Sequence, residues 1–523
     1  MQSVQGSDAI PAPSSLPSSK SVFIKWGLLG SVGLINGYAT ILMYSRGELA
    51  FALLTVILTA LALYIFGSKK TYAHRYIYPG IAGMILFILF PLAYTVGLAF
   101  TNYSAKNQLS LERTQTVLLD RSFQSGESYP FTLYKTDNGH QIVVKDGDQL
   151  LATDVFSLEG MTATEMDLSA IESVQGEKEK IKAIIQNRSA ISGVDFHLPD
   201  GDDIRMSGLR KFAAVAPLYT LQGDGETLIN NESGEVLKPN MEVGFYQPVD
   251  EKGEFIGNTI SPGFVVDIGT ANFERVWKDD GIKEPFISIF IWTVVFSICT
   301  VVFTLAIGLI LANIVQWEEL KGRSIYRVLL ILPYAVPAFI SILIFKGLFN
   351  QSFGEINMVL ESIFGLSPNW FSDPILAKTM VLIVNTWLGF PYMMILCMGL
   401  LKAIPEDLYE ASAIDGANFL DNFKRITFPL MIKPLTPLLI AAFAFNFNNF
   451  VMIQLLTNGG PNMIGTSEPA GYTDLLVSYT YRIAFEGGGG QDFGLASAIA
   501  TLIFLLVGAL ALLNLRFTKL TQD

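Results

Sequence analysis

Eight apolar runs, each about as long as one bilayer crossing, limit what this chain can fold into. A helix needs about 20 apolar residues to cross the hydrocarbon core. Because backbone groups in lipid must be hydrogen-bonded within the protein, such runs predict membrane-spanning helices. The expected spans are residues 22–44, 48–66, 77–100, 286–315, 325–349, 377–401, 431–453 and 493–515.

The charges concentrate in one long polar insert. The chain has 523 residues, of which 51% are hydrophobic and 16% are charged. Residues 101–283 carry 17 Lys and Arg but 29 Asp and Glu, whereas the rest of the chain holds 18 of each. No basic patch with interleaved aromatic residues occurs, which argues against nucleic-acid binding.

Basic residues beside the spans predict the orientation in the membrane. Cytoplasmic loops carry an excess of Lys and Arg. If the N-terminus is cytoplasmic, fourteen basic residues flank the spans on the inside and four on the outside. We therefore expect both termini in the cytoplasm and the insert outside. The expected parts are a disordered tail (1–20), three spans (21–100), the insert (101–283), and a five-span core (284–523) with a cytoplasmic loop (402–430) and an outside loop (454–492).

The insert has the patterns of an independently folded, mostly β domain. Residues 141–156 alternate around an Asp-Gly turn and residues 194–206 predict a second hairpin. Residues 164–186 are charged and have a helical period, which predicts a helix. A stalk and a docking surface remain equally open as functions of this domain.

Spans five and six contain helix-breaking residues. Pro333 and Pro337 fall in span five, and Gly389, Phe390 and Pro391 fall in span six. Proline removes a backbone donor and kinks a helix. The freed carbonyls then need neighbouring helices or a water-filled cavity. Ordinary kinks remain possible, but their clustering points to a lined pathway.

Span seven combines asparagine and phenylalanine in an otherwise apolar run, AAFAFNFNNF. Unpaired amides in hydrocarbon are costly, so these should face protein or solvent. They can join helices by hydrogen bonds. Alternatively, amides and phenyl faces suit an uncharged sugar, which is the interpretation we favour. We expect one helical face to carry Ala442, Phe445, Asn446, Asn449 and Ile453.

The outside loop ends in four consecutive glycines, residues 487–490. Glycine reaches backbone conformations that are closed to other residues. The run is either a flexible linker or part of a loop that reaches into the ligand site of a docked partner.

Residues 405–429, which we call the coupling segment, are polar and lie between two spans. Pro405 and the acidic Glu406 and Asp407 suit a helix start. Gly416 is placed to end that helix in a left-handed turn, and a second helix could begin after Asn418. Taken alone, this pattern fits an amphipathic connector on the lipid headgroups.

Residues 410–429 read EASAIDGANFLDNFKRITFP. Their spacing resembles the cytoplasmic signature EAA-x3-G-x9-I-x-LP of bacterial ABC-importer permeases, with Ser412 in place of Ala and Phe428 in place of Leu. The resemblance favours a helix that docks into a cytoplasmic ATPase.

The whole chain resembles the larger permease subunits of bacterial maltose/maltodextrin ABC importers. FAFNFNNF, LTNGGP, GYTDLL and YRIAFEGGGGQDFG carry this resemblance. It implies a polytopic α-helical protein of the bacterial inner membrane, with the ABC-importer permease fold, eight transmembrane helices and an immunoglobulin-like, mostly β, periplasmic insert.

The resemblance also implies partners and site residues. The partners would be a second, smaller permease, a homodimeric ATPase that binds ATP and Mg, and a periplasmic maltose-binding protein that delivers the sugar. Relatives have Ser where this chain has Ala442. Sugar would be held by Leu388, Gly389, Tyr392, Phe445, Asn446, Asn449 and Val451, and the ATPase would be contacted by Glu410, Ala411, Ser412, Asp415 and Gly416.

Other functional classes lack their chemistry in this sequence. No GxxxxGK[ST] phosphate loop occurs, so the chain cannot itself be the ATPase. It offers no metal-ligand spacing and no Ser/His/Asp catalytic grouping, and we expect no cofactor and no enzymatic activity in this chain. A permease for another oligosaccharide remains the alternative. An ion-coupled secondary transporter is less favoured, because no Asp or Glu lies in the middle of a span.

Overall fold

The computed structural model describes the chain except for residues 1–18, 159–163, 200, 202, 488–490 and 521–523. The predicted tail and most of the glycine run therefore lie outside the described residues. The chain divides into two compact units, residues 1–97 and 98–523, which are described one at a time.

The first unit consists of mostly apolar helices. The hairpin of α1 (Ser19–Ser45) and α2 (Leu49–Gly67) is followed by α3 (His74–Met84), which continues through the π-helical η1 (Ile85–Leu89) into α4 (Phe90–Leu98). Their apolar side chains are mostly exposed, as expected of helices that face lipid. Three candidate membrane spans result, in agreement with the predicted runs.

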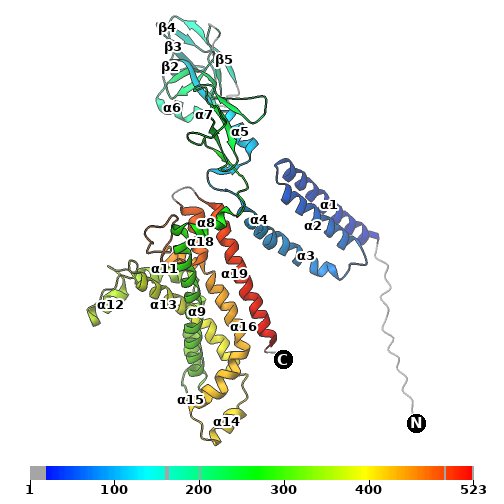
Figure 1. The fold of residues 1–523 in the computed structure, drawn as a ribbon, viewed down its shortest axis with the longest axis vertical. Coiled ribbons are helices and arrows are strands. Elements are labelled where there is room, and N and C mark those ends of the chain that lie inside the picture. The colour runs from blue at the N-terminus through cyan, green and yellow to red at the C-terminus, as the bar shows by residue number, and fades with distance from the viewer. Residues whose placement is uncertain (1–18, 159–163, 200, 202, 488–490, 521–523) are drawn as a thin grey trace. The chain divides into compact units, whose positions relative to one another are not determined.

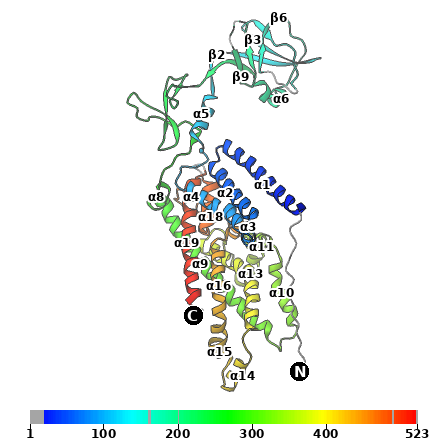
Figure 2. The ribbon, with the colours of Figure 1, turned by 90° about the vertical axis from the view of Figure 1, so that its right-hand side faces the viewer.

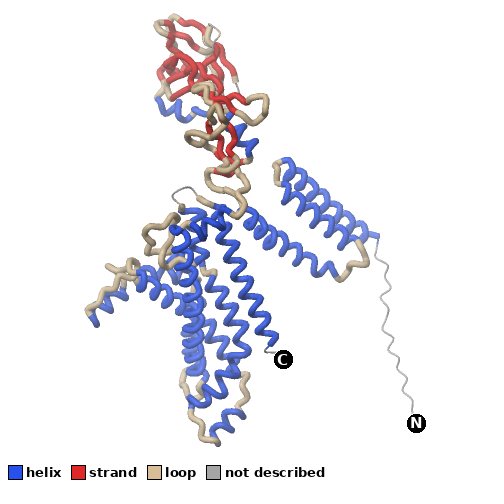
Figure 3. The backbone as a smooth tube through the Cα atoms, in the orientation of Figure 1, coloured by secondary structure: helices blue, strands red, loops and turns tan. Residues whose placement is uncertain are grey.

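Strands in the described part of the chain all lie between Asn107 and Phe264, which confirms a β-rich insert (Figure 3). A nine-stranded sheet has the order β5-β8-β9-β10-β2-β3-β4-β6, with β7 paired to β2. Its core includes Phe212, stacked against Phe131 and Phe196 at ring distances of 4.1 and 4.6 Å. These strands are β2 (Ser122–Thr136), β3 (Gly139–Asp146), β4 (Gln149–Ala152), β5 (Glu165–Asp167), β6 (Ser169–Ile171), β7 (Glu177–Lys178), β8 (Asp195–His197), β9 (Asp203–Gly208) and β10 (Lys211–Pro217).

A smaller sheet of four antiparallel strands follows along the chain, and the first and last strands of the insert form a parallel pair. Tyr246 and Phe264 belong to the buried core beneath it. The remaining elements are β1 (Asn107–Leu109), α5 (Leu111–Leu119), α6 (Ile181–Gln186), α7 (Arg188–Ile191), β11 (Tyr219–Leu221), β12 (Leu228–Asn230), β13 (Val236–Asn240), β14 (Phe245–Pro248) and β15 (Gly263–Phe264).

Two of the three local predictions for the insert are confirmed, and one is largely wrong. The hairpins expected at 141–156 and 194–206 are the antiparallel pairs β3–β4 and β8–β9. The helix expected at 164–186 forms only as α6 at its end. The earlier part forms β5, β6 and β7, because each pairs with a distant strand that supplies its backbone hydrogen bonds.

The helical core that follows the insert is built around α9, which lies against both α13 and α16 (Figure 2). Its elements are α8 (Ala271–Lys278), α9 (Asp280–Gln316), α10 (Arg323–Ala335), α11 (Ala338–Leu348), α12 (Glu355–Phe364), α13 (Pro374–Leu401), α14 (Asp407–Ile414), α15 (Phe419–Asn422), η2 (Phe423–Thr427), α16 (Phe428–Phe447), α17 (Phe450–Leu456), α18 (Leu476–Glu486) and α19 (Phe493–Leu520).

Proline has different effects in spans five and six. Helices α10 and α11 meet at a 91° bend between Pro333 and Ala338, which confirms the predicted break. Helix α13, by contrast, continues through Pro391. Over the described residues, six helices can cross a membrane, or seven if the bent pair is one span. The total of eight stays a prediction, since the described apolar part of α19 (Phe493–Ala509) is short.

Candidate functional site

The coupling segment folds as its sequence predicts. Helix α14 follows Pro405, and Asp407 and Glu410 lie in its first turn, where negative charge is favoured. Gly416 has φ +76°, a conformation that glycine adopts without strain. Asn418 then caps α15 by accepting a hydrogen bond from the Asp421 backbone N–H.

The base of α14 is fixed in the helical core. Tyr409 packs with a buried cluster that includes Met394 and Met431. Its hydroxyl lies 2.9 Å from the Thr427 hydroxyl, within hydrogen-bond distance, and joins α14 to the start of span seven. The Ser412 hydroxyl donates to the Tyr409 carbonyl at 2.8 Å. The Tyr409–Thr427 contact therefore ties α14 to the helical segment that follows it, whereas the Ser412 bond lies within α14.

The tip of the coupling segment is apolar and exposed. Ile414 is 88% exposed and Phe419 is 70% exposed, with Leu420 beside them in sequence. The predicted ATPase-contact residues Glu410, Ala411, Asp415 and Gly416 are all exposed, while Ser412 is half-buried. An apolar tip with carboxylates nearby suits either a protein partner or a membrane surface.

A second polar group lies inside the core and links three helices. Asn385 of α13 donates to Asn446 Oδ1 at 2.7 Å and to the Thr300 hydroxyl at 3.2 Å. Its own Oδ1 accepts from Asn449 Nδ2 at 3.1 Å. We call Asn385, Asn446, Asn449 and Thr300 the amide network. These hydrogen bonds are the interhelical contacts that the sequence left open for span seven.

The predicted single face of span seven is wrong. Helix α16 ends at Phe447 and α17 begins at Phe450, because Asn449 caps the second helix by accepting from the Met452 N–H. Phe445 is consequently 72% exposed, whereas Ile453 is fully buried. The break also turns Asn449 toward Asn385.

The predicted sugar residues divide into two groups. Asn446 and Asn449 are brought together through Asn385. The side chains of Tyr392, Phe445 and Val451 are exposed, and Leu388 and Gly389 are half-buried. The role of all seven in sugar binding stays a prediction.

Gly389 has a packing reason of its own. A Cβ added there would lie 2.8 Å from Thr304 Cγ2 of α9, so a larger residue would push the two helices apart.

The outside loop is held by a buried ion pair. Arg482 Nη1 of α18 contacts Asp474 Oδ2 at 2.9 Å, and both side chains are buried. Arg482 also donates to Asn462 Oδ1, while Asp474 accepts from the Gly471 N–H and the Ser478 hydroxyl. The pair therefore joins the GGPN and GYTD parts of the loop into one rigid unit.

Burial raises the pKa of Asp474 to about 6, although Arg482 and the hydrogen bonds act in the opposite direction. The carboxylate is therefore mainly ionised at neutral pH and matched by Arg482.

Sequence reasoning missed Asn385, Asp474 and Arg482. Asn385 is one amide within the apolar run VLIVNTWLGF. The expectation applied to span seven, that an amide in hydrocarbon faces protein or solvent, would also have identified Asn385 as a candidate. Asp474 and Arg482 had no such signal, because their pairing depends on how a loop folds against α18. Over the described residues no group of three His, Cys, Asp or Glu side chains could hold a metal ion.

Comparison with known families defines the class of this protein. Residues 304–519, which contain the coupling segment and the three asparagines of the amide network, match the binding-protein-dependent transport system inner membrane components. The chain thus has the fold of an ABC-importer permease with a β-rich insert, as expected. Residues 109–269 match the P2 domain of the maltose transport system permease protein MalF, and residues 23–70 match the MalF N-terminal transmembrane helices.

Full-length relatives narrow the class to one family. The chain is 83% identical to the maltose/maltodextrin transport system permease protein MalF of Vibrio vulnificus strain YJ016, over 100% of both chains. It is 78% identical to that of Vibrio cholerae strain N16961, also over 100% of both. It is 60% identical to that of Escherichia coli K12, over 96% of this chain and 97% of the relative. The chain belongs to the MalF family of transport permeases.

Proposed function

We propose that this chain is the larger permease subunit of an ATP-driven importer of maltose and maltodextrins in the bacterial inner membrane. It forms half of the sugar pathway and couples that pathway to a cytoplasmic ATPase dimer by alternating access. The observation that carries the proposal is the coupling segment, in which an exposed apolar tip stands on a base fixed to the spans.

The coupling segment supports transmission as a rigid body. Closure of an ATPase dimer around ATP moves whatever is seated in its cleft. Tyr409 and Thr427 link α14 to span seven, so that a push on the tip acts on the helix carrying Asn446. Glu410, Ala411, Ser412, Asp415 and Gly416 would contact the ATPase. ATP and Mg would be bound by that partner, and this chain would hold no nucleotide.

The pathway would be shared with a second, smaller permease. Spans five to seven expose apolar and aromatic side chains, including Tyr392, Phe445 and Val451. A second permease would cover this face and complete the passage. Alternating access then requires the two permeases to part first on the outside and then on the inside.

The sugar site would combine the two asparagines with the exposed aromatic side chains among the predicted sugar residues. Phenyl and tyrosyl faces from Phe445 and Tyr392 would cover the apolar face of a pyranose, while Asn446 and Asn449 would bind its hydroxyls. Asn385 would orient both amides from behind, because it already holds each of them. Leu388, Gly389 and Val451 would complete the shape of the site. Ala442 would contribute no hydroxyl to the site.

The remaining parts would serve delivery of the sugar. With both termini in the cytoplasm, the insert and the outside loop face the periplasm, where a maltose-binding protein would dock. The Asp474–Arg482 pair keeps its loop in one conformation, which suits a surface that must match a partner.

Purification of the intact assembly tests this proposal. The chain would be isolated from its native membrane in mild detergent, and ATPase activity would be measured with and without maltose-loaded binding protein. We expect a second permease, two copies of an ATPase, and hydrolysis stimulated by the loaded binding protein. A solitary chain without nucleotide hydrolysis, together with sugar uptake driven by an ion gradient, would refute the proposal.

A further inference from the structure

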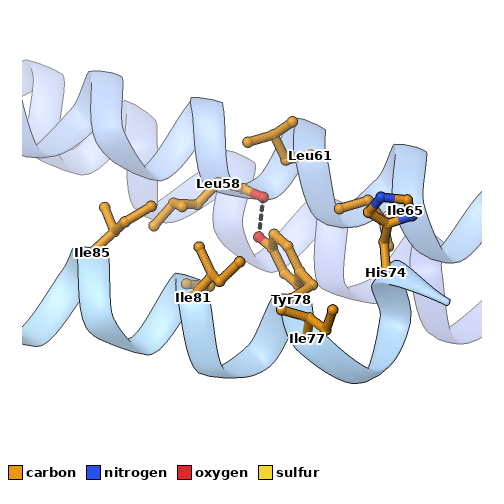
Figure 4. A pocket seen from close by; sticks show the side chains of 9 residues that line it. Leu58, Leu61, Ile65, His74, Ile77, Tyr78, Ile81 and Ile85 are labelled. Carbon is orange, nitrogen blue, oxygen red and sulfur yellow. Dashed lines mark hydrogen bonds between the residues drawn. The ribbon is translucent and has the colours of Figure 1, made fainter. Parts of the chain in front are cut away.

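An apolar groove of about 170 Å³ lies between α2 and α3 of the first unit. Figure 4 shows its lining, with Leu58, Leu61 and Ile65 facing residues of α3 and η1. The hydroxyl of Tyr78 donates to the Leu58 carbonyl, so the only polar atom of this side chain is hydrogen-bonded to the backbone of α2 (Figure 4). Apolar cavities of about 150 Å³ stay dry and bind hydrocarbon, so this groove can accept part of an acyl chain.

The groove runs along the helices from the connection between them. Ile65 and His74 lie at the end next to residues 68–73, and Leu58 and Ile85 lie at the other end. The twelve residues from His74 to Ile85 span eleven helical rises, which correspond to about 16 Å, or roughly half the hydrocarbon core. The groove therefore has the direction and length of one leaflet's acyl chains.

Basic side chains gather at the end of the groove next to this connection. Arg75 donates to the carbonyls of Ile65 and Ser68 at 3.2 and 2.7 Å. Lys25 donates to the Gly67 carbonyl at 3.1 Å. Both cations thus cap the C-terminal end of α2, which is a structural role that accounts for their positions.

Lys69 and Lys70 have no such role. Both are exposed in the connection between two candidate spans. Among the described residues, no carboxylate forms an ion pair with Lys69, Lys70, Arg75 or Lys25. Glu48, the one acidic residue described in this unit, lies at the opposite end of α2. The positive charge at the groove therefore lacks a protein counter-ion among these residues.

We propose that this groove and its basic end form a binding site for an anionic phospholipid. The headgroup phosphate pairs with Lys69 and Lys70, and one acyl chain occupies the groove between α2 and α3. Charge complementarity selects an anionic lipid over a zwitterionic one, since basic residues at a membrane surface each attract anionic headgroups. Every residue of this site belongs to the first unit.

A photoreactive lipid tests the site. The complete assembly, with this chain at full length, would be reconstituted in phosphatidylcholine nanodiscs containing traces of phosphatidylglycerol with a diazirine midway along one acyl chain. After irradiation, mass spectrometry would locate the adducts. We expect them on residues 58–65 and 77–85. The Lys69→Gln/Lys70→Gln variant should give about 30-fold less of them, on the basis of two lost surface charges.

Matched variants separate the site from general lipid contact. The Lys321→Gln/Arg323→Gln pair, in another connection between spans, should leave the adduct yield unchanged. Ala82→Trp, which fills the groove, should remove the adducts there but keep those elsewhere on the assembly, which also reports that the chain is folded. Equal labelling by a matched phosphatidylcholine probe would overturn the proposal, as would displacement of the probe by soluble glycerol 3-phosphate.

Discussion

The coupling segment precedes span seven, and two members of the amide network, Asn446 and Asn449, lie within that span. The two regions differ in what they expose to their surroundings. The coupling segment exposes its apolar tip, with Ile414 88% exposed, and fixes only its base. The amide network is enclosed, and its members bind one another across α9, α13 and the broken span seven.

This difference in exposure determines how each region can bind a partner or a ligand. An exposed apolar tip on a rigid base suits a protein partner or a membrane surface that covers it. Enclosed amides are already satisfied within the chain, so any ligand they bind must compete with existing hydrogen bonds. Substitutions should therefore disturb coupling without unfolding in the first region, and disturb packing in the second.

The largest effect is expected for Glu410→Lys. Reversing an exposed charge at the first turn of α14 places a cation at the positive helix start and in the contact with the ATPase. We expect ATP-driven maltose uptake to fall about 100-fold, corresponding to several kcal/mol of unfavourable contact, while membrane insertion is retained. Glu319→Lys, an exposed acid in another connection between spans, is the matched control. Full uptake by the Glu410 variant would contradict the coupling role.

Asn385→Ala should have the next largest effect, and on stability rather than on coupling. It leaves the Asn446 oxygen and the Asn449 amide without their partner. We expect a loss of about 2 kcal/mol, measured as a lower thermal midpoint of the purified assembly.

Asn448→Ala is its control, because that exposed side chain bonds only within its own helix. Adding Asn446→Ala to the Asn385 variant should cost little more, since the pair is already broken. Full additivity of the two changes would argue against a shared network.

Local sequence predicted the coupling segment well, because its caps and its glycine act within a few residues. Pro405, Gly416 and Asn418 begin or end elements where expected. The first three spans followed from apolar run length alone. The same reasoning failed for residues 164–178, where distant strands provide the hydrogen bonds that decide the structure.

The amide network was only half predicted for a related reason. Asn446 and Asn449 were marked by their apolar surroundings, but their partner lies more than 60 residues away in another helix. The break at Asn448 occurs because Asn449 caps α17. This capping is a local signal, but it was overlooked because span seven was assumed to be one continuous helix. Under the proposed function, a second permease would cover the exposed faces of spans five to seven, and its contacts would lie outside this chain's sequence.

Phe445→Ala tests the sugar-binding proposal with a smaller expected effect. The side chain is 72% exposed, so its removal should leave the thermal midpoint unchanged. Loss of an aromatic face from a pyranose should raise the sugar concentration for half-maximal uptake about tenfold. Phe504→Ala, an exposed phenylalanine in α19, is the control. An unchanged sugar concentration for half-maximal uptake would show that Phe445 does not contact the sugar.

Tyr409→Phe should have the smallest effect. It deletes the hydroxyl that lies 2.9 Å from Thr427 but keeps the ring in its apolar cluster. One hydrogen bond contributes about 1 kcal/mol, so we expect less than about a fivefold fall in sugar transported per ATP hydrolysed. Thr427→Val should give the same change, and the double variant no further one. A larger fall in sugar transported per ATP hydrolysed in the double variant would show that the two hydroxyls do not act through their mutual hydrogen bond.

ATP-dependent uptake in vesicles tests the central claim most directly. The purified assembly would be reconstituted with the ATPase side accessible, and labelled maltose uptake would be followed with maltose-binding protein on the other side. We predict uptake that requires ATP, fails with a non-hydrolysable analogue, and persists when ionophores collapse all ion gradients. Uptake that continues without ATP and stops with the ionophores would contradict the account.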